Sequence, residues 1–332
     1  MAEAVEMVDL WRGGMVESRH RGHAVICDGA GAVLEAWGDP GAVIYPRSSV
    51  KMIQALPLVE SGAAEAAGLD DADLALACAS HEGAPVHVAR IAAWLDRLGL
   101  SEADLRCGAQ PSRDSAERKR MLIAGEAPSQ LHNNCSGKHA GFLTLARHLG
   151  AGGDYNYTGH PVQRAIRAAF EDVTGQASPC FGIDGCSAPN FATTMHGLGR
   201  AMAFFATARP DAATPRVRAA ARLTGAMLAH PDLVAGEGRA CTELMRAVDG
   251  RVAVKTGAEG VFVAILPERG LGIAVKIEDG ATRAAEAAIA GLLIRLGVLD
   301  PEHPATRGRL GGPIRNWRGI VTGEIRLAPG FG

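Results

Sequence analysis

The sequence has no long hydrophobic run and no large charge of either sign. No apolar run reaches the ~18 residues that a membrane-spanning helix needs. The 332 residues carry a formal net charge of −2, which argues against a nucleic-acid partner and against an anionic membrane surface. We therefore expect neither nucleic acid nor membrane as a partner.

An export signal is also missing from the amino-terminal region. The first twenty residues include Glu3, Glu6, Asp9 and Glu17, with no basic stretch followed by an apolar core, so we expect no signal peptide. The seven cysteines are an odd number. Without an export signal they indicate thiols in a reducing cytoplasm rather than a disulfide framework.

Composition and hydrophobic pattern predict a mixed fold. Apolar residues make up 47% and aromatic residues only 5% of the chain, with 42 glycines, so we expect a real core with closely packed backbones. Apolar runs predict strands at 22–26, 32–37, 252–255, 261–266 and 271–277. Helical spacing of apolar residues predicts helices over 85–98, 140–148, 198–208, 216–229 and 283–296.

These elements favour an α/β mixed fold, in which an antiparallel sheet packs against helices and a largely helical lobe is added. We expect residues 1–332 to form a single domain. Its sheet part would comprise about 15–45 and 250–332, and its helical lobe about 46–249.

The segment 47–51 (RSSVK) places hydroxyls and an amine close together. Ser48 and Lys51 are three positions apart, so on a helix they share one face with roughly 5–6 Å between Cβ atoms. A lysine that loses its proton beside a serine is a general base beside a nucleophile. The alternative is a serine that only caps a helix, since S-x-x-K is common by chance.

A second lysine motif, Lys255-Thr256-Gly257, follows far downstream. S-x-x-K followed much later by K-T-G is the order found in serine β-lactamases and penicillin-binding proteins. Burial and a second nearby cation both favour the neutral form of a lysine. If Lys51 and Lys255 face one cavity, Ser48 and Ser80 could each have a lysine partner. The alternative for Lys255 is a solvated side chain beside a hairpin turn.

Two cysteines and a lysine form a candidate metal site. Cys135 and Lys138 are three positions apart, and Cys186 follows about fifty residues later. Two thiolates and a nitrogen donor could hold Zn²⁺, although a lysine must lose its proton to coordinate. Ordinary buried cysteines are the alternative. Glu82 and Asp184 are predicted loop carboxylates that could bind the α-ammonium group of an amino acid or simply be solvated.

Five blocks along the chain jointly resemble one family: 45–51 (YPRSSVK), 79–83 (ASHEG), 132–139 (HNNCSGKH), 182–186 (GIDGC) and 255–260 (KTGAEG). The sequence resembles the rhizobial-type (class 3) L-asparaginases, also called the asparaginase II family, over nearly its whole length. The resemblance implies a fold like that of the serine β-lactamases and penicillin-binding proteins. It also implies a homodimer that hydrolyses L-asparagine to L-aspartate and ammonia.

The resemblance also implies roles for particular residues. Ser48 with Lys51, and Ser80 with Lys255, would be two catalytic Ser-Lys pairs. Cys135, Lys138 and Cys186 match ligands of a Zn²⁺ ion near the substrate. The positions that would line the substrate pocket are Arg47, Glu82, His139, Asp184 and Cys241.

We favour Ser48 as the nucleophile, because it shares a helix turn with Lys51 and a helix N-terminus favours developing negative charge. The reverse assignment has Ser80 attacking. Two other functions remain as alternatives. One is another β-lactamase-like Ser-Lys amidase or esterase, and the other is a non-catalytic amino-acid-binding protein.

Overall fold

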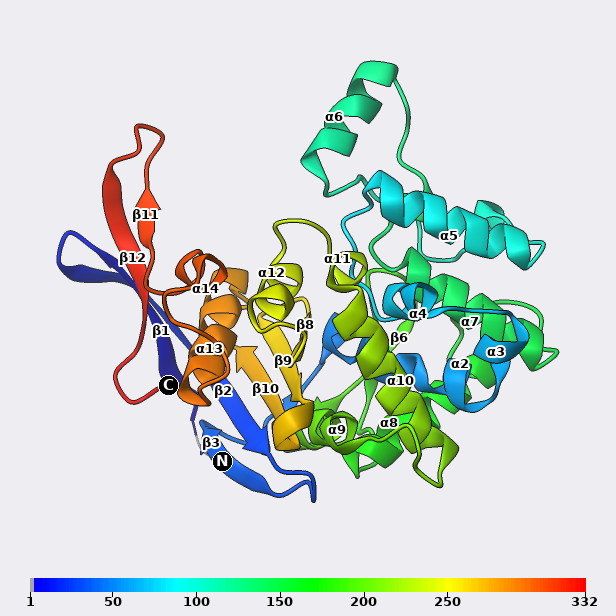
Figure 1. Ribbon diagram of the computed structural model, residues 1–332, viewed down its shortest axis with the longest axis horizontal. Coiled ribbons are helices and arrows are strands. Elements are labelled where there is room, and N and C mark those ends of the chain that lie inside the picture. Colours follow the sequence, from blue (N-terminus) through cyan, green and yellow to red (C-terminus); the bar gives the residue numbers. More distant parts are fainter. Residues whose placement is uncertain (1–2) are drawn as a thin grey trace. The chain divides into compact units, whose positions relative to one another are not determined.

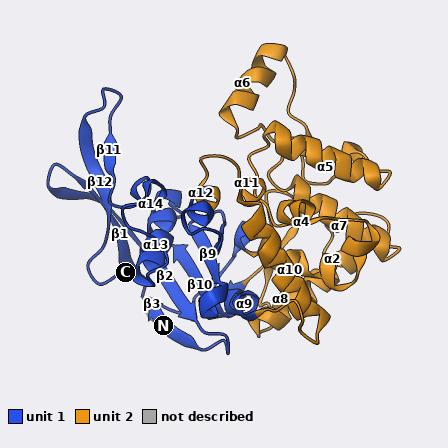
Figure 2. Cartoon of the chain, viewed as in Figure 1, with its two compact units in different colours: residues 1–49, 193–207, 243–332 blue, residues 50–192, 208–242 orange. Residues whose placement is uncertain are grey.

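The computed structural model describes residues 3–332. The chain forms two compact units, each built from segments that are distant in sequence (Figure 2). In the described part of the chain, unit 1 comprises residues 3–49, 193–207 and 243–332, and unit 2 comprises residues 50–192 and 208–242.

Unit 1 is built on an antiparallel sheet in the order β11-β12-β1-β2-β10-β9-β8, with β3 paired to β2 (Figure 1). The strands are β1 (Val5–Arg12), β2 (Met15–Cys27), β3 (Val33–Trp37), β8 (Ala253–Thr256), β9 (Val261–Leu266), β10 (Leu271–Ile277), β11 (Pro313–Arg315) and β12 (Val321–Leu327). Two short strands, β4 (Val43–Ile44) and β7 (Thr193–Thr194), pair separately in the same unit.

Two helices cover the middle of this sheet. The helices α9 (Met195–Thr207) and α13 (Thr282–Arg295) both pack on β9 and β10. Every residue of β9 is buried, so its two faces are both covered. A β carbon added to Gly272 would lie 2.1 Å from the backbone nitrogen of Ala203 and 2.5 Å from the carbonyl of Gly199. Glycine therefore lets α9 lie directly on β10.

Unit 2 is largely helical. Its helices are α1 (Lys51–Gln54), α2 (Leu56–Glu60), α3 (Ala63–Ala66), α4 (Asp71–Ala77), α5 (Pro85–Arg97), α6 (Ser115–Ala124), α7 (Ser136–His148), α8 (Pro161–Thr174), α10 (Pro215–Ala229) and α11 (Pro231–Val234). A two-stranded hairpin, β5 (Phe181–Ile183) with β6 (Pro189–Phe191), completes it. The helix α12 (Ala240–Ala247) runs across the boundary between the units.

Helix boundaries in unit 2 follow from local chemistry. His160 caps α8 by accepting a hydrogen bond from the Val162 N–H, Pro161 opens it, and Gly175 ends it in the left-handed conformation. Polar contacts then join the helices. The Trp94 indole of α5 donates to Thr144 of α7 at 3.0 Å, and both side chains are buried. Arg216 of α10 pairs with Glu60 of α2 and Asp172 of α8.

The predicted α/β mixed fold, with an antiparallel sheet, packed helices and a helical lobe, is confirmed. The five predicted strands form in one sheet, with the 22–26 and 32–37 runs paired as a hairpin. The polar, turn-rich sequence of residues 180–190 predicts a loop, and this prediction was wrong, because β5 and β6 pair there around a short turn. The strands β1 and β11 and the helix α6 were not predicted. Among the described residues, no helix combines the length and the apolar character needed to cross a membrane.

The close contact at Gly272 generates a stability prediction. Gly272→Ala forces α9 away from β10, and overpacking of this kind costs about 1–3 kcal/mol. The matched control is Gly225→Ala in α10, where an added β carbon meets nothing within 4 Å. It should be neutral or stabilising by up to ~1 kcal/mol, from helix propensity. Thermal unfolding of both variants measures the difference, and equal melting temperatures would contradict this packing.

Candidate functional site

The predicted site residues fall on both units, and each set is described within its own unit. Arg47, Ser48 and Lys255 belong to unit 1. The other predicted residues belong to unit 2 and come from the segments around Lys51, Ser80, Cys135, Asp184 and Cys241.

Ser48 lies on a strained turn. Residues Arg47–Val50 form a 3-10 turn that leads directly into α1. Arg47 has φ +54°, a left-handed conformation that is uncommon for a residue with a side chain. Its guanidinium lies 3.7 Å from the carboxylate of Glu259, which also has a positive φ of +59°. Backbone strain of this kind clusters at functional sites and persists only where the surroundings hold it.

The K-T-G segment lies beside this turn within unit 1. Lys255, on β8, is completely buried and donates a hydrogen bond to the Thr256 carbonyl at 2.9 Å. A β carbon added to Gly257 would lie 2.7 Å from the Pro46 carbonyl and 3.2 Å from the Ser49 nitrogen. The structure thus brings the two motifs of unit 1 together. The alternative of a solvated Lys255 is wrong.

In unit 2, the amine of Lys51 joins three segments. Lys51 is 1% exposed, and its Nζ donates hydrogen bonds to the carbonyls of Ala79 and Asn134, the second at 3.2 Å. Its two acceptors are thus the residues that directly precede Ser80 and Cys135, two of the predicted site residues. Ser80 is 5% exposed, and its N–H donates to the Val234 carbonyl at 2.9 Å.

The three predicted metal ligands come together in unit 2. Cys135 precedes α7, Lys138 lies in its first turn, and Cys186 lies in the turn of the β5–β6 hairpin. The Lys138 Nζ is 3.0 Å from the Cys186 Sγ, and the Cys135 and Cys186 thiols are within hydrogen-bonding range. All three side chains are buried. The sulfurs and the amine therefore converge on one buried point.

The charges at this cluster are strongly perturbed. The hydrogen bond with Cys135, followed by the nearby Lys138 cation, holds the pKa of Cys186 well below its usual value. The same sulfur–sulfur hydrogen bond and burial raise the pKa of Cys135 to about 12. Burial alone would lower the pKa of Lys138, but the Cys186 and Cys135 sulfurs raise it. The Lys138 amine and the Cys186 sulfur therefore each favour the charged form of the other.

The donor set is unusual for a metal. Across residues 3–332, no three or more His, Cys, Asp or Glu side chains form a group that could hold a metal ion. The cluster at Cys135 offers two sulfurs and an amine instead. Sulfur and nitrogen are donor atoms that Zn²⁺ accepts, but a lysine must lose its proton before it can coordinate.

His139 supplies an unsatisfied polar atom next to this cluster. Its ring is fully buried, and its Nδ1 lies 2.8 Å from the Tyr155 hydroxyl, which accepts a hydrogen bond from the Arg106 N–H. Burial and then the Lys138 charge lower the pKa of His139. The ring Nε2 has no hydrogen-bond partner among the described residues. The sequence did not identify Tyr155, because no motif around it indicates that its hydroxyl contacts His139.

Glu82 and Asp184 have structural partners. The Glu82 side chain accepts the Glu237 N–H at 3.0 Å, and any β carbon at Gly236 would overlap its carboxylate. Gly236 in turn donates to Thr242, the neighbour of the buried Cys241 on α12. Asp184, on the hairpin turn, accepts the Gly185 N–H at 2.6 Å.

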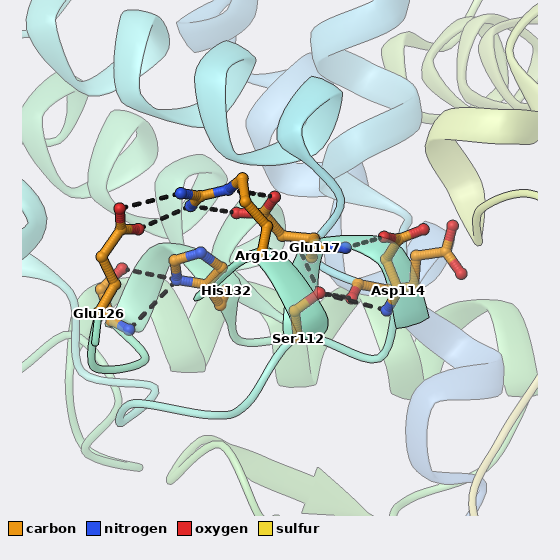
Figure 3. A network of polar contacts seen from close by, with 9 residues as sticks. Ser112, Asp114, Glu117, Arg120, Glu126 and His132 are labelled. Carbon is orange, nitrogen blue, oxygen red and sulfur yellow. Dashed lines mark hydrogen bonds and ion pairs between the residues drawn. The ribbon is translucent and has the colours of Figure 1, made fainter. Parts of the chain in front are cut away.

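A network of polar contacts that runs from Ser112 to Glu126 was not predicted (Figure 3). Ser112 donates to the carbonyls of Glu82 and Gly83 at 3.1 and 3.0 Å. Asp114 caps α6 by accepting the Glu117 N–H, and Arg120 joins Glu117 to Glu126. An acidic residue followed three positions later by glutamate is the sequence signature of a capped helix start. That signal was present at 114–117 and would have identified α6.

The sequence model of one protein family matches residues 8–327 of the chain. It is the model of a family of hydrolases that act on amide C–N bonds, so the chain is an enzyme of that class. Its description reads L-asparaginase II, and the chain belongs to this family. The predicted family and enzyme class are thereby confirmed. No curated protein matches the sequence.

Solved structures with a similar fold include β-lactamases. A putative β-lactamase from Bacteroides dorei is 11% identical, with 77% of this chain and 84% of that chain covered at a TM-score of 0.42. A β-lactamase from Mycobacterium bovis is 13% identical, with 84% of this chain and 95% of that chain covered at a TM-score of 0.39. A β-lactamase from Sulfitobacter sp. EE-36 is 18% identical, with 82% of this chain and 93% of that chain covered at a TM-score of 0.41.

Burial of the Glu82 carboxyl generates a pH prediction. Desolvation, and then the Asp114 charge, raise the pKa of Glu82 in the folded protein. Its contribution to stability is therefore present at low pH and is lost as pH rises through the folded pKa. Glu82→Gln keeps an acceptor for the Glu237 N–H but does not titrate. The melting temperature of the variant minus that of the wild type should increase between roughly pH 4 and 7.

Glu117→Gln is the matched control of opposite sign. Hydrogen bonds from Arg120 lower the pKa of Glu117, so its contribution is present above the unfolded pKa and is lost as pH falls. The same difference in melting temperature should therefore decrease with rising pH. Parallel curves for the two variants would contradict the assignment of these charges.

Proposed function

We propose that the protein hydrolyses L-asparagine to L-aspartate and ammonia, in the cytoplasm and as a homodimer. The observation that carries the reaction is the match of the L-asparaginase II family to residues 8–327. The burial of the Lys51 and Lys255 amines supports it, because burying a lysine amine is costly and both amines lie in the motif segments. A small-molecule substrate agrees with this family.

In the proposed reaction, Ser48 is the nucleophile. Its oxygen attacks the side-chain amide carbonyl, its proton passes to Lys51 and then to the departing nitrogen, and ammonia leaves an aspartyl ester on Ser48. Water then adds to the ester and releases aspartate. Ser48 is partly exposed whereas Ser80 is 5% exposed, which supports Ser48 as the group that meets substrate. Ser80 and Lys255 would complete the proton relay.

The contacts of Lys51 suit a base. A neutral lysine amine has two N–H donors and one lone pair, whereas the ammonium form has three donors and no acceptor. The two carbonyls of Ala79 and Asn134 accept two donors. The neutral amine would therefore have both donors occupied and its lone pair available for the Ser48 proton.

We further propose that Cys135, Lys138 and Cys186 hold a Zn²⁺ ion. The convergence of two sulfurs and an amine at one buried point supports this, since a divalent cation would replace the Lys138 proton and offset both sulfurs. Two thiolates reduce the Lewis acidity of the ion, so its contribution when bound would be to orient substrate.

The remaining predicted residues would position the substrate. The Arg47 guanidinium suits its α-carboxylate, and Asp184 or Glu82 suits its α-ammonium group. The unpartnered Nε2 of His139 would form a hydrogen bond with the substrate. The buried Cys241 would form part of the pocket wall.

The nucleophile assignment is tested by ammonia release from L-asparagine. Ser48→Ala should reduce turnover by at least about 10³-fold, as expected for loss of a nucleophile. The control is Ser49→Ala next to it, whose hydroxyl donates to the Pro46 carbonyl at 2.7 Å. It should lose about 0.5–1.5 kcal/mol of stability and keep its turnover. Near-normal turnover in Ser48→Ala, with Ser80→Ala inactive, would establish the reverse assignment.

The metal proposal is tested by metal analysis of the purified protein. Cys135→Ser and Cys186→Ser should each lower the zinc content well below one ion per chain. Cys107→Ser, a buried cysteine outside the proposed ligand set, is the control and should keep its zinc. Chelation should raise KM with less effect on kcat, because the ion is proposed to orient substrate. If chelation changes neither constant, that role is wrong.

A further inference from the structure

Lys276 is the one charged residue of β10, a central strand of the unit 1 sheet. Val275 and Ile277 on either side of it are completely buried, and its own side chain is partly exposed. Its Nζ donates a hydrogen bond to the main-chain carbonyl of Glu259, in the turn that follows the K-T-G segment. Because lysine is among the residues that are least often buried, its place on this strand calls for a reason.

Glu259 lies between two cationic side chains. Lys276 contacts its main-chain carbonyl, and the Arg47 Nη1 lies 3.7 Å from its carboxylate. Burial lowers the pKa of Lys276, the carboxylates of Glu259, Asp279 and Glu278 oppose that shift, and the Arg47 charge adds to it. The amine of Lys276 and the guanidinium of Arg47 therefore act on the same residue at different atoms.

The turn that contains Glu259 is closed by its own hydrogen bonds. The Gly257 N–H donates to the Val261 carbonyl at 2.7 Å, and the Ile277 N–H donates to the Gly260 carbonyl at 2.9 Å, which joins the turn to β10. Between these contacts, Glu259 has φ +59°. A left-handed conformation is unfavourable for a residue with a side chain and persists where the surroundings hold it. The lysine hydrogen bond to its carbonyl is one such contact.

This turn touches the segment that carries Ser48. Gly257 lies against the backbone of Pro46 and Ser49, with only 2.7 and 3.2 Å between an added β carbon and their nearest atoms. Arg47, which lies between them and directly precedes Ser48, is also left-handed and is paired with the glutamate carboxylate of the turn. A displacement of the turn would therefore displace the backbone on both sides of Ser48.

We propose that Lys276 and Glu259 are positioning residues for the reaction at Ser48. Lys276 holds the main chain of the 257–260 turn, and Glu259 holds the Arg47 guanidinium. The inference rests on the proposed function, in which Ser48 is the nucleophile and Arg47 binds the α-carboxylate of the substrate. The two contacts can be tested separately, because one is made to a main-chain carbonyl and the other to a side chain.

The first test is the steady-state kinetics of ammonia release from L-asparagine. Lys276→Met removes the amine and should lower kcat roughly 10- to 100-fold with a smaller change in KM, because a displaced nucleophile slows the chemical step. Lys276→Arg keeps a donor for the Glu259 carbonyl and should recover most of the lost kcat. Glu259→Gln should mainly raise KM, because it releases the Arg47 guanidinium.

Lys119→Met is the matched control. Lys119 is an exposed lysine of α6, so its loss should leave kcat and KM at the values of the wild type. Melting temperatures verify that all variants fold. Should Lys276→Met fail to fold, Glu259→Gln alone decides, and wild-type values of both constants in that variant would overturn the proposal.

The second test is amide hydrogen exchange, which does not depend on turnover. Lys276→Met should speed exchange in the peptides that contain Ser49 and Gly257, because their N–H groups are hydrogen-bonded within the two turns. Peptides from α5 and α8 should exchange at the rate of the wild type. Faster exchange together with a wild-type kcat would make the lysine contact structural only and overturn the positioning role.

The outcomes separate this inference from the proposed function. An active wild type with unchanged kcat and KM in both Lys276→Met and Glu259→Gln overturns the positioning role and leaves the reaction at Ser48 intact. A wild type that releases no ammonia overturns the proposed reaction. In that case exchange still tests the contact: unchanged exchange at Ser49 and Gly257 in Lys276→Met overturns it, and faster exchange supports it.

Discussion

The burial of lysine amines is the constraint around which unit 2 is arranged. A buried lysine amine loses its hydrogen bonds to water unless other groups replace them. Lys51 is satisfied by the carbonyls of Ala79 and Asn134, so its side chain fixes the spacing of α1, the end of α4 and the start of α7. Lys138 is satisfied by the sulfur of Cys186, which fixes the β5–β6 turn against α7. The candidate chemistry and the local fold thus depend on the same contacts.

In unit 1, the arrangement depends on segments whose backbones lie in direct contact at glycine residues. Gly257 lets the turn after Lys255 reach the Pro46 carbonyl, and Gly272 lets α9 lie on β10. Arg47 and Glu259 both have a left-handed backbone conformation, and their side chains form an ion pair. The sheet therefore presents Ser48 and Lys255 from neighbouring segments, in a backbone geometry that a relaxed chain would not adopt.

The sequence predicted what depends on periodicity and on motif order. Strands such as Val261–Leu266 and helices such as Pro85–Arg97 follow from hydrophobic spacing, and the pairing of S-x-x-K with K-T-G followed from their order along the chain. The left-handed Arg47, the Tyr155–His139 contact and the Lys276–Glu259 contact depend on tertiary structure, which no local pattern encodes. The wrong loop prediction at 180–190 has a similar cause: a hairpin of three-residue strands has too few positions to show an alternating pattern.

Covalent catalysis at Ser48 is the central claim, and acid-quenched mass spectrometry during turnover of L-asparagine tests it most directly. One aspartyl group should be added to the peptide that contains Ser48. This adduct should disappear when the substrate is exhausted and the quench is delayed. An aspartyl group on the peptide that contains Ser80 would instead make Ser80, and not Ser48, the nucleophile.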